Sequence, residues 1–126
     1  MMLMGEKTRY SDEELEEFRA LIEKKMASTK DEIKYYKDSI DKLTEASEGD
    51  HSSFDSEDGS SSMEKERLMQ NLERQRKFYG HLEKALLRIE NKTYGICRQT
   101  GKLIQKERLK IVPHATLSVA AKENRG

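Results

Sequence analysis

Several residue types are nearly absent from this sequence, and each shortage excludes a class of protein. The 126 residues include one cysteine, one proline and no tryptophan, and only 34% of them are hydrophobic. One cysteine cannot form an internal disulfide or a cage of several thiolates, which excludes a disulfide-linked secreted scaffold. Because globular domains are roughly 45–50% apolar, a chain this short and polar cannot build the thick core of a compact α/β enzyme.

Long apolar runs are missing as well. The opening residues 1–4 are Met-Met-Leu-Met, and they give way at once to Gly5 and Glu6. This run is far shorter than a signal-peptide core or the roughly 20 apolar residues of a membrane-spanning helix. We therefore expect a soluble, cytoplasmic protein with no membrane partner.

Charge, by contrast, is abundant and unevenly placed. The 24 basic and 24 acidic residues cancel. Residues 45–64 nevertheless hold seven acidic side chains and no basic one, whereas residues 92–126 hold eight basic and two acidic ones. The sequence is therefore bipolar, with an acidic middle and a basic C-terminal end.

The first helix is predicted from residue 12 to about residue 46. Ser11 and Glu14 can form a capping box, and Tyr10 with Leu15 can form a hydrophobic staple. No proline or glycine interrupts residues 12–46. The apolar or neutral positions follow the three-and-four spacing of a heptad seam: Leu15, Ile22, Met26, Thr29, Ile33, Tyr36, Ile40 and Leu43.

A second seam supplies the partner that such a long helix needs. Ser61 and Glu64 offer another capping box, and the seam runs through Leu68, Leu72, Gln75, Tyr79, Leu82, Leu86 and Ile89. Residues 46–60 are rich in Ser, Gly and Asp and have no helical period, which predicts a loop. The predicted fold is mainly α. It has an N-terminal tail at 1–10 and a long antiparallel coiled-coil hairpin at 11–91 with an acidic tip loop.

The tip loop has two interpretations. One is a solvated turn that keeps the hairpin soluble. The other rests on the D-x-x-D spacing of Asp55 and Asp58, because a stalk of about 45–50 Å would deliver these carboxylates into a narrow channel lined by basic groups or a metal. The seams can pair within one chain or between chains. The loop length and the matched seams favour one chain, so we expect a monomer.

The C-terminal unit is predicted at 92–126. Residues 94–104 indicate two short β pieces around a turn at Gly101. We expect a short helix at 106–111 and, after the break at Pro113, a final helix at 116–123. The basic side chains of this unit suit phosphate groups, but one aromatic ring, Tyr94, offers little base stacking, and we expect no direct specific DNA binding.

The sequence around the single cysteine predicts neither a metal site nor a catalytic site. A zinc ribbon needs a second ligand three residues after the first and another pair about 15–20 residues later. After Cys97, those positions hold Thr100, Ser118 and Ala121. Hydroxyls are poor zinc ligands and alanine has no donor, so we expect no metal. Cys97 and His114 lack a third orienting group, so we expect no enzyme activity.

The C-terminal sequence resembles the finger region of the DksA/TraR transcription factors. The resemblance covers roughly residues 12–123, because the hairpin matches the family in length and order. The family's four zinc-ligand cysteines fall on Cys97, Thr100, Ser118 and Ala121, which implies a degenerate, metal-free finger. The residues that carry the resemblance are Tyr94-Gly95-Ile96-Cys97, Thr100-Gly101-Lys102-Leu103-Ile104, Glu107-Arg108-Leu109, Pro113 and Ala115.

The resemblance implies a bacterial transcription regulator that binds RNA polymerase. The coiled-coil tip would enter the secondary channel of the enzyme and modulate initiation. The residues implied to act at the tip are Asp55, Glu57 and Asp58, and Glu57 is included because ungapped counting back from Cys97 places an acidic family position there.

The resemblance also implies five residues as candidates for polymerase or nucleotide contact: Asn71, Arg74, His81, Arg108 and Lys122. In relatives that respond to guanosine tetraphosphate, cationic side chains clasp the phosphates. Arg74 and Lys122 match such positions, whereas His81 stands for a lysine and Val112 for an arginine. Two charge-assisted hydrogen bonds to the phosphates are therefore lost, and we expect no cofactor. Guanosine tetraphosphate stays open as an alternative.

Without zinc, the finger needs another source of stability. We expect the Thr100 and Ser118 hydroxyls to form local hydrogen bonds beside an apolar cluster of Ile96, Leu103, Ile104, Leu109, Ile111, Val112 and Leu117. Two other functions stay open. One is a structural or adaptor coiled coil, and the less favoured one is a DNA-binding protein that uses the basic end.

Overall fold

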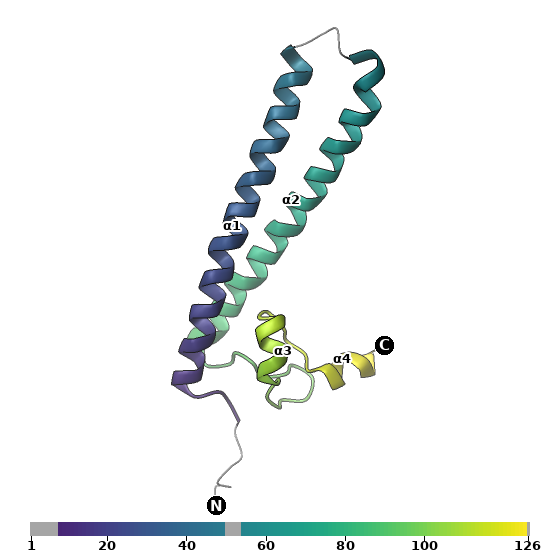
Figure 1. Ribbon diagram of the computed structural model, residues 1–126. Helices are drawn as coiled ribbons and strands as arrows, with labels where there is room; N and C mark the ends of the chain where they lie inside the picture. The colour runs from purple at the N-terminus through teal and green to yellow at the C-terminus, as the bar shows by residue number, and fades with distance from the viewer. Residues whose placement is uncertain (1–7, 50–53, 126) are drawn as a thin grey trace, which may run out of the picture. The chain divides into compact units, whose positions relative to one another are not determined.

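The fold is mainly helical. A computed structural model describes residues 8–49 and 54–125, with side chains for 8–46 and 62–122. Two long helices, α1 (Asp12–Gly49) and α2 (Phe54–Glu90), precede two short ones, α3 (Lys106–Ile111) and α4 (Val119–Arg125) (Figure 1). Within the described residues, no helix combines the length and apolar content needed to cross a membrane.

The chain divides into two compact units, and both long helices continue from one unit into the other. The base unit comprises Met1–Lys25 with His81–Gly126, and the coil unit comprises Met26–Gly80. In each unit, a stretch of α1 packs along a stretch of α2 that runs in the opposite direction (Figure 1). The predicted antiparallel helical hairpin is therefore confirmed.

The start of α1 is the predicted capping box. The backbone N–H of Ser11 donates to Glu14 Oε1 at 2.9 Å, and the N–H of Glu14 donates to Ser11 Oγ at 3.1 Å. The two staple residues, Tyr10 and Leu15, are both buried. These contacts satisfy amides that a helix start leaves without intrahelical partners, so α1 begins where the sequence indicated.

Both predicted seams face inward. In α1, Leu15, Ile22 and Thr29 are buried and the remaining seam residues are partly buried. In α2, Leu68, Leu82 and Ile89 are buried. The other members of that seam, Leu72, Gln75, Tyr79 and Leu86, are partly buried.

The loop predicted at 46–60 is wrong over most of its length, because helix occupies much of that range. Helical backbone continues to Gly49 in α1 and already resumes at Phe54 in α2, which leaves residues 50–53 outside the described part of the chain. Ser61 and Glu64 therefore lie within α2 rather than at its start. No proline breaks this segment. Acidic side chains are favourable near a helix N-terminus, so its polar composition does not prevent a helix.

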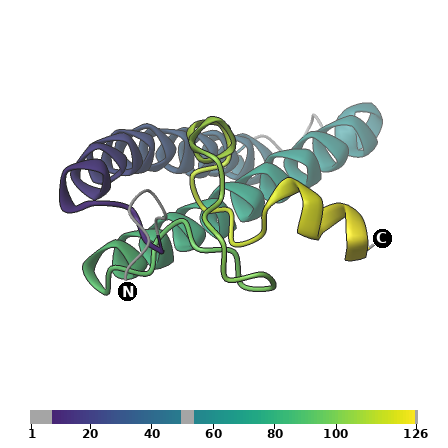
Figure 2. The same ribbon diagram turned by 90° about the horizontal axis from the view of Figure 1, so that it is seen from below.

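The C-terminal segment is less regular than predicted. Within the described residues, one isolated antiparallel bridge between Ile96 and Leu103 replaces the two β pieces. The helix predicted at 106–111 is present as α3. The last helix begins at Val119, three residues later than predicted, because Ser118 caps it: Ser118 Oγ accepts the N–H of Ala121 at 3.2 Å. Figure 2 shows α3 and α4 joined by an irregular segment.

Candidate functional site

The finger unit, residues 92–125 of the base unit, is built on a tight knuckle around the Ile96–Leu103 bridge. The N–H of Cys97 donates to the Lys102 carbonyl and the N–H of Gly101 donates to the Cys97 carbonyl, both at 2.8 Å. Gly101 has a φ of +74°, which side chains with a Cβ rarely adopt. The knuckle thus depends on the glycine that the sequence placed at the turn.

The four positions that match zinc ligands lie together in the structure. The N–H of Ser118 donates to Cys97 Sγ at 3.4 Å, and the Thr100 hydroxyl donates to the same sulfur. Ala121 follows Ser118 on the first turn of α4 and is buried. The four positions therefore lie close together, but only one of them carries a donor atom that suits zinc.

The donor chemistry at these positions does not fit zinc. Zinc in structural sites takes four thiolate, imidazole or carboxylate ligands. Here Cys97 supplies one sulfur, Ala121 supplies no donor, and the two hydroxyls are engaged locally: Thr100 Oγ1 accepts the Lys102 N–H at 3.2 Å. No group of three His, Cys, Asp or Glu side chains suited to a metal occurs among the described residues.

Hydrogen bonds stabilise the Cys97 sulfur. The hydroxyl of Thr100, followed by the backbone N–H groups of Ser118, Thr100 and Gln99, lowers the pKa of the Cys97 thiol to about 6. The Cys97 side chain is only 1% exposed. These donors favour the thiolate form of Cys97, because each presents a hydrogen atom to the sulfur.

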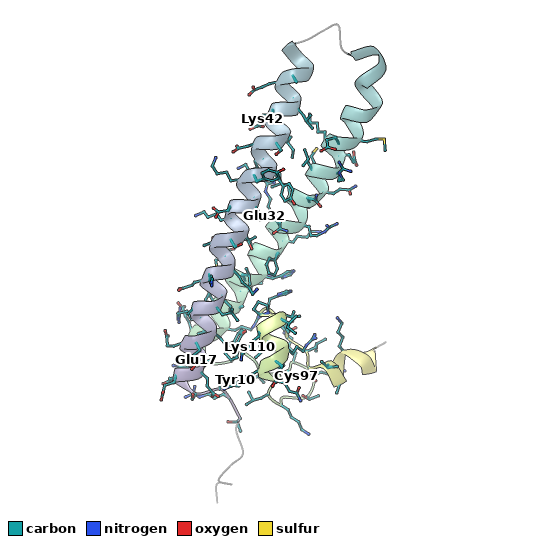
Figure 3. All side chains as sticks on the ribbon, viewed as in Figure 1. Tyr10, Glu17, Glu32, Lys42, Cys97 and Lys110 are labelled. Carbon is teal, nitrogen blue, oxygen red and sulfur yellow. The ribbon has the colours of Figure 1, made fainter. Side chains whose placement is uncertain are left out.

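Aromatic rings form the main packing of the base unit. Tyr10 packs edge-on against Phe18, and Phe18 packs at a tilt against Tyr94, with ring centroids 5.4 Å and 5.1 Å apart. The Tyr10 hydroxyl donates to the carbonyl oxygen of Ile104, and the Tyr94 hydroxyl donates to that of Pro113 at 2.8 Å. Burial raises the pKa of both tyrosines, so both stay protonated as donors. Figure 3 labels Tyr10 of this cluster among the side chains of the base unit.

Gly95 allows the closest approach in this cluster. Its φ is +79°, and a Cβ added there would lie 2.6 Å from the Tyr10 ring and 3.2 Å from Leu109. The Gly95 carbonyl also accepts the N–H of Ile104 at 2.7 Å. Any side chain at this position would push Tyr10 away from the finger.

Polar ties hold the finger unit to the ends of the long helices. Lys106 pairs with Glu14, and Lys92 pairs with Asp12, each with an N···O distance of 2.7 Å. The Arg108 Nε donates to the Leu117 carbonyl at 2.8 Å, which joins α3 to the segment before α4. The first two pairs are partly solvated and contribute little each, so the aromatic packing dominates.

The predicted apolar cluster is present with one error. Ile104 and Leu109 are fully buried, while Ile96, Leu103, Val112 and Leu117 are partly buried. Ile111 is 79% exposed, so its predicted place in the cluster is wrong. Residues two apart on a helix lie on nearly opposite faces, and α3 already directs Leu109 inward. The predicted local hydrogen bonds of Thr100 and Ser118 are both present.

The contact candidates fall in different units. In the coil unit, Arg74 Nη1 donates to Asn71 Oδ1 at 3.3 Å and both side chains face solvent. In the base unit, the His81 ring stacks on that of His114, and the charge of Arg108 acts on the same His114. Lys122 is exposed on α4. The structure thus gives His81 and Arg108 a common neighbour.

The tip acids Asp55, Glu57 and Asp58 lie on the backbone of the first turns of α2. Their side chains fall outside the part of the chain whose side chains are described. Which of the three acts at the tip therefore stays a prediction.

The structural roles of three residues in the base unit were not predicted from the sequence. Phe18 lies three residues after Leu15 and four before Ile22, so its helical spacing was a usable signal. Tyr94 is fully buried, so its ring packs inside the base unit instead of being available for base stacking. Arg88, whose Nη2 donates to the His114 carbonyl at 3.4 Å, had no local signal because its partner lies 26 residues away.

Comparisons with known proteins agree with this architecture. Residues 92–124 match the model of the prokaryotic dksA/traR C4-type zinc finger. Two curated relatives, the RNA polymerase-binding transcription factor DksA from two strains of Caulobacter vibrioides, are 45% identical over 51 residues, which are 40% of this chain. The match spans 36% of the relatives' own length, so about one third of each relative is compared.

The structural likeness extends further along the chain. The structure of transcription factor DksA2 from Pseudomonas aeruginosa superposes with a TM-score of 0.79 and 26% sequence identity, and the match covers 88% of this chain and 81% of that one. The finger unit matches the zinc-finger model of the DksA/TraR family and the chain as a whole is similar to DksA2, with cysteine at one of the four positions that match zinc ligands.

Proposed function

We propose that this protein is a transcription regulator that binds RNA polymerase and acts through the acidic tip of its hairpin. The observation that carries the proposal is the likeness to DksA2 over 88% of the chain, hairpin and finger together. The curated relatives are named as RNA polymerase-binding transcription factors. In this proposal the protein works in the cytoplasm as a regulator and is not an enzyme.

The charge distribution supports an insertion mechanism. Residues 45–64 carry seven acidic side chains and no basic one. A carboxylate cluster at the end of a narrow helical hairpin suits the basic, metal-containing interior of a polymerase secondary channel. In this proposal the tip acts on initiation, while the finger and the contact candidates anchor the protein, namely Asn71, Arg74, His81, Arg108 and Lys122.

The tip mechanism is tested with the Asp55→Asn/Asp58→Asn double variant. We expect it to lose the effect on promoter open-complex lifetime while its affinity for core polymerase stays within about threefold, because the anchoring residues are unchanged. Glu57→Gln alone tests the register: a loss of the effect in this variant, with the double variant active, would move the acting residue to Glu57. The measurements are open-complex decay and polymerase binding.

A matched control is Asp31→Asn/Asp41→Asn, which removes two exposed carboxylates from α1. It should retain the full effect on open complexes. If the control loses as much activity as the tip variant, net charge rather than tip position is responsible, and the tip mechanism fails.

One retention experiment separates the three functions. Immobilised chain retains core polymerase under the proposal and does not under the adaptor alternative. Under the DNA-binding alternative, duplex DNA alone binds with an affinity that falls steeply with salt. Adding guanosine tetraphosphate to the same assay tests the open alternative of a nucleotide cofactor.

A further inference from the structure

Two histidines from distant parts of the sequence form a stacked pair in the base unit. The rings of His81, on α2, and His114, in the segment between α3 and α4, have centroids 5.2 Å apart and planes only 10° apart. His81 is exposed, whereas His114 is partly buried. A stack of this kind is favourable between neutral imidazoles and becomes repulsive when both carry a proton.

The groups around His114 oppose a further positive charge. Arg88 and His81 face it from α2, and Arg108 faces it from α3. Arg98 lies near Arg88 and, with burial, lowers the pKa of that guanidinium, which stays protonated at any physiological pH. Burial first, and then these three neighbours, lower the pKa of His114 below its ordinary value.

The backbone around His114 connects three parts of the finger unit. Its carbonyl accepts from Arg88 Nη2, and the carbonyl of the preceding Pro113 accepts the buried Tyr94 hydroxyl. Two residues later, the Thr116 carbonyl accepts the N–H of Arg98 at 2.8 Å. A shift of this segment would therefore disturb its hydrogen bonds to α2, to the aromatic cluster and to the knuckle.

We propose that the His81–His114 stack is a pH-sensitive latch that holds the segment between α3 and α4 against α2 and loosens when His114 takes up a proton. The proposal does not depend on polymerase binding. It rests on the ring geometry and on the convergence of His81, Arg88 and Arg108 upon one partly buried imidazole.

The direction of the pH effect follows from the lowered pKa. Below about pH 6.5 the unfolded chain binds a proton at His114 that the folded chain resists, so the free energy of unfolding falls as the pH falls. The contribution is complete above the unfolded value and lost as the pH drops through the folded value. Each unit of difference between the two values raises the unfolding constant about tenfold at acid pH.

The test is a histidine-ring NMR titration of the full chain from about pH 8 to about pH 5, with amide exchange read at Ala115 and Thr116. We expect His114 to titrate below the value of the unfolded chain and the two amides to exchange faster as it does so. In His81→Gln, one neighbouring charge is removed, so the His114 midpoint should rise. His81 is exposed, and this variant should fold.

Two further variants make the outcome decisive. His114→Gln should reduce the pH dependence of the unfolding constant, whereas His51→Gln, which removes a histidine outside the stack, should keep it. The latch is refuted if His114 titrates at or above its unfolded value, if His81→Gln leaves that midpoint unchanged, or if the two amides are indifferent to pH.

Discussion

The two units use the same pair of helices but bury them very differently. Among the described residues, every buried hydrophobic side chain except Leu68 lies in the base unit. The coil unit adds one buried polar residue, Thr29, and leaves Tyr35, Met63 and Met69 largely exposed. The base unit is therefore the folded core, and the coil unit is a pair of helices that share a thin, partly buried seam.

This difference shows how a chain with 34% hydrophobic residues can fold. Its apolar surface is concentrated where the finger unit covers the ends of both helices. The coil unit has exposed ion pairs along single helices, such as Lys34 with Asp38 at 3.0 Å, which are worth a few tenths of a kcal/mol each.

The largest effect should come from removing a ring of the aromatic cluster. Tyr94→Ala deletes a fully buried side chain and its hydrogen bond to Pro113, and we expect it to cost about 3–5 kcal/mol of stability. Tyr35→Ala, at a ring that is 61% exposed in the coil unit, should change stability by less than about 0.5 kcal/mol. Denaturant unfolding of both variants measures the contrast, and equal losses would break it.

Glycine substitutions sharpen the comparison. Gly95→Ala introduces a Cβ 2.6 Å from the Tyr10 ring at a φ of +79°, so we expect a loss of about 2–3 kcal/mol. Gly80→Ala, in α2 of the coil unit with nothing within 4 Å of the new Cβ, should instead gain about 0.5–1 kcal/mol.

Gly101→Ala separates the two causes at Gly95. Its φ is +74° but no atom lies within 4 Å of an added Cβ, so it reports backbone strain alone. We expect a loss of about 1 kcal/mol, measured by thermal or denaturant unfolding. A Gly95→Ala loss no larger than this would mean that the contact with Tyr10 is unimportant.

Features set by neighbouring residues could be predicted from the sequence, and those set by distant ones could not. The start of α1 depends on Ser11 and Glu14, which are three residues apart, and the prediction was accurate. The Tyr10–Ile104 hydrogen bond joins residues 94 positions apart, and no local pattern encodes it. Periodicity located the seams, but it gave no measure of how much deeper the base unit is buried.

The same reasoning applies to the candidate site. The positions equivalent to zinc ligands were found from their spacing, and the failure of their donor chemistry could be inferred from residue type alone. What replaces the metal could not be inferred in full, because the contacts of Tyr10, Phe18 and Arg88 with the finger appear only after folding. The loop predicted at 46–60 was wrong for another reason. Serine and aspartate suit a loop and the first turns of a helix equally well.

The smallest expected change in stability comes from two serines that stand in the same sequence pattern. Ser11 and Ser61 each precede a glutamate by three residues, but Ser11 caps α1 in the base unit while Ser61 lies inside α2 in the coil unit. Ser11→Ala should therefore cost about 1 kcal/mol, and Ser61→Ala should gain up to about 0.5 kcal/mol because alanine is the better helix former. Denaturant unfolding measures both. A loss of about 1 kcal/mol in Ser61→Ala would mean that α2 begins at residue 61, with a long loop before it, and that the coil unit is shorter than the structure gives.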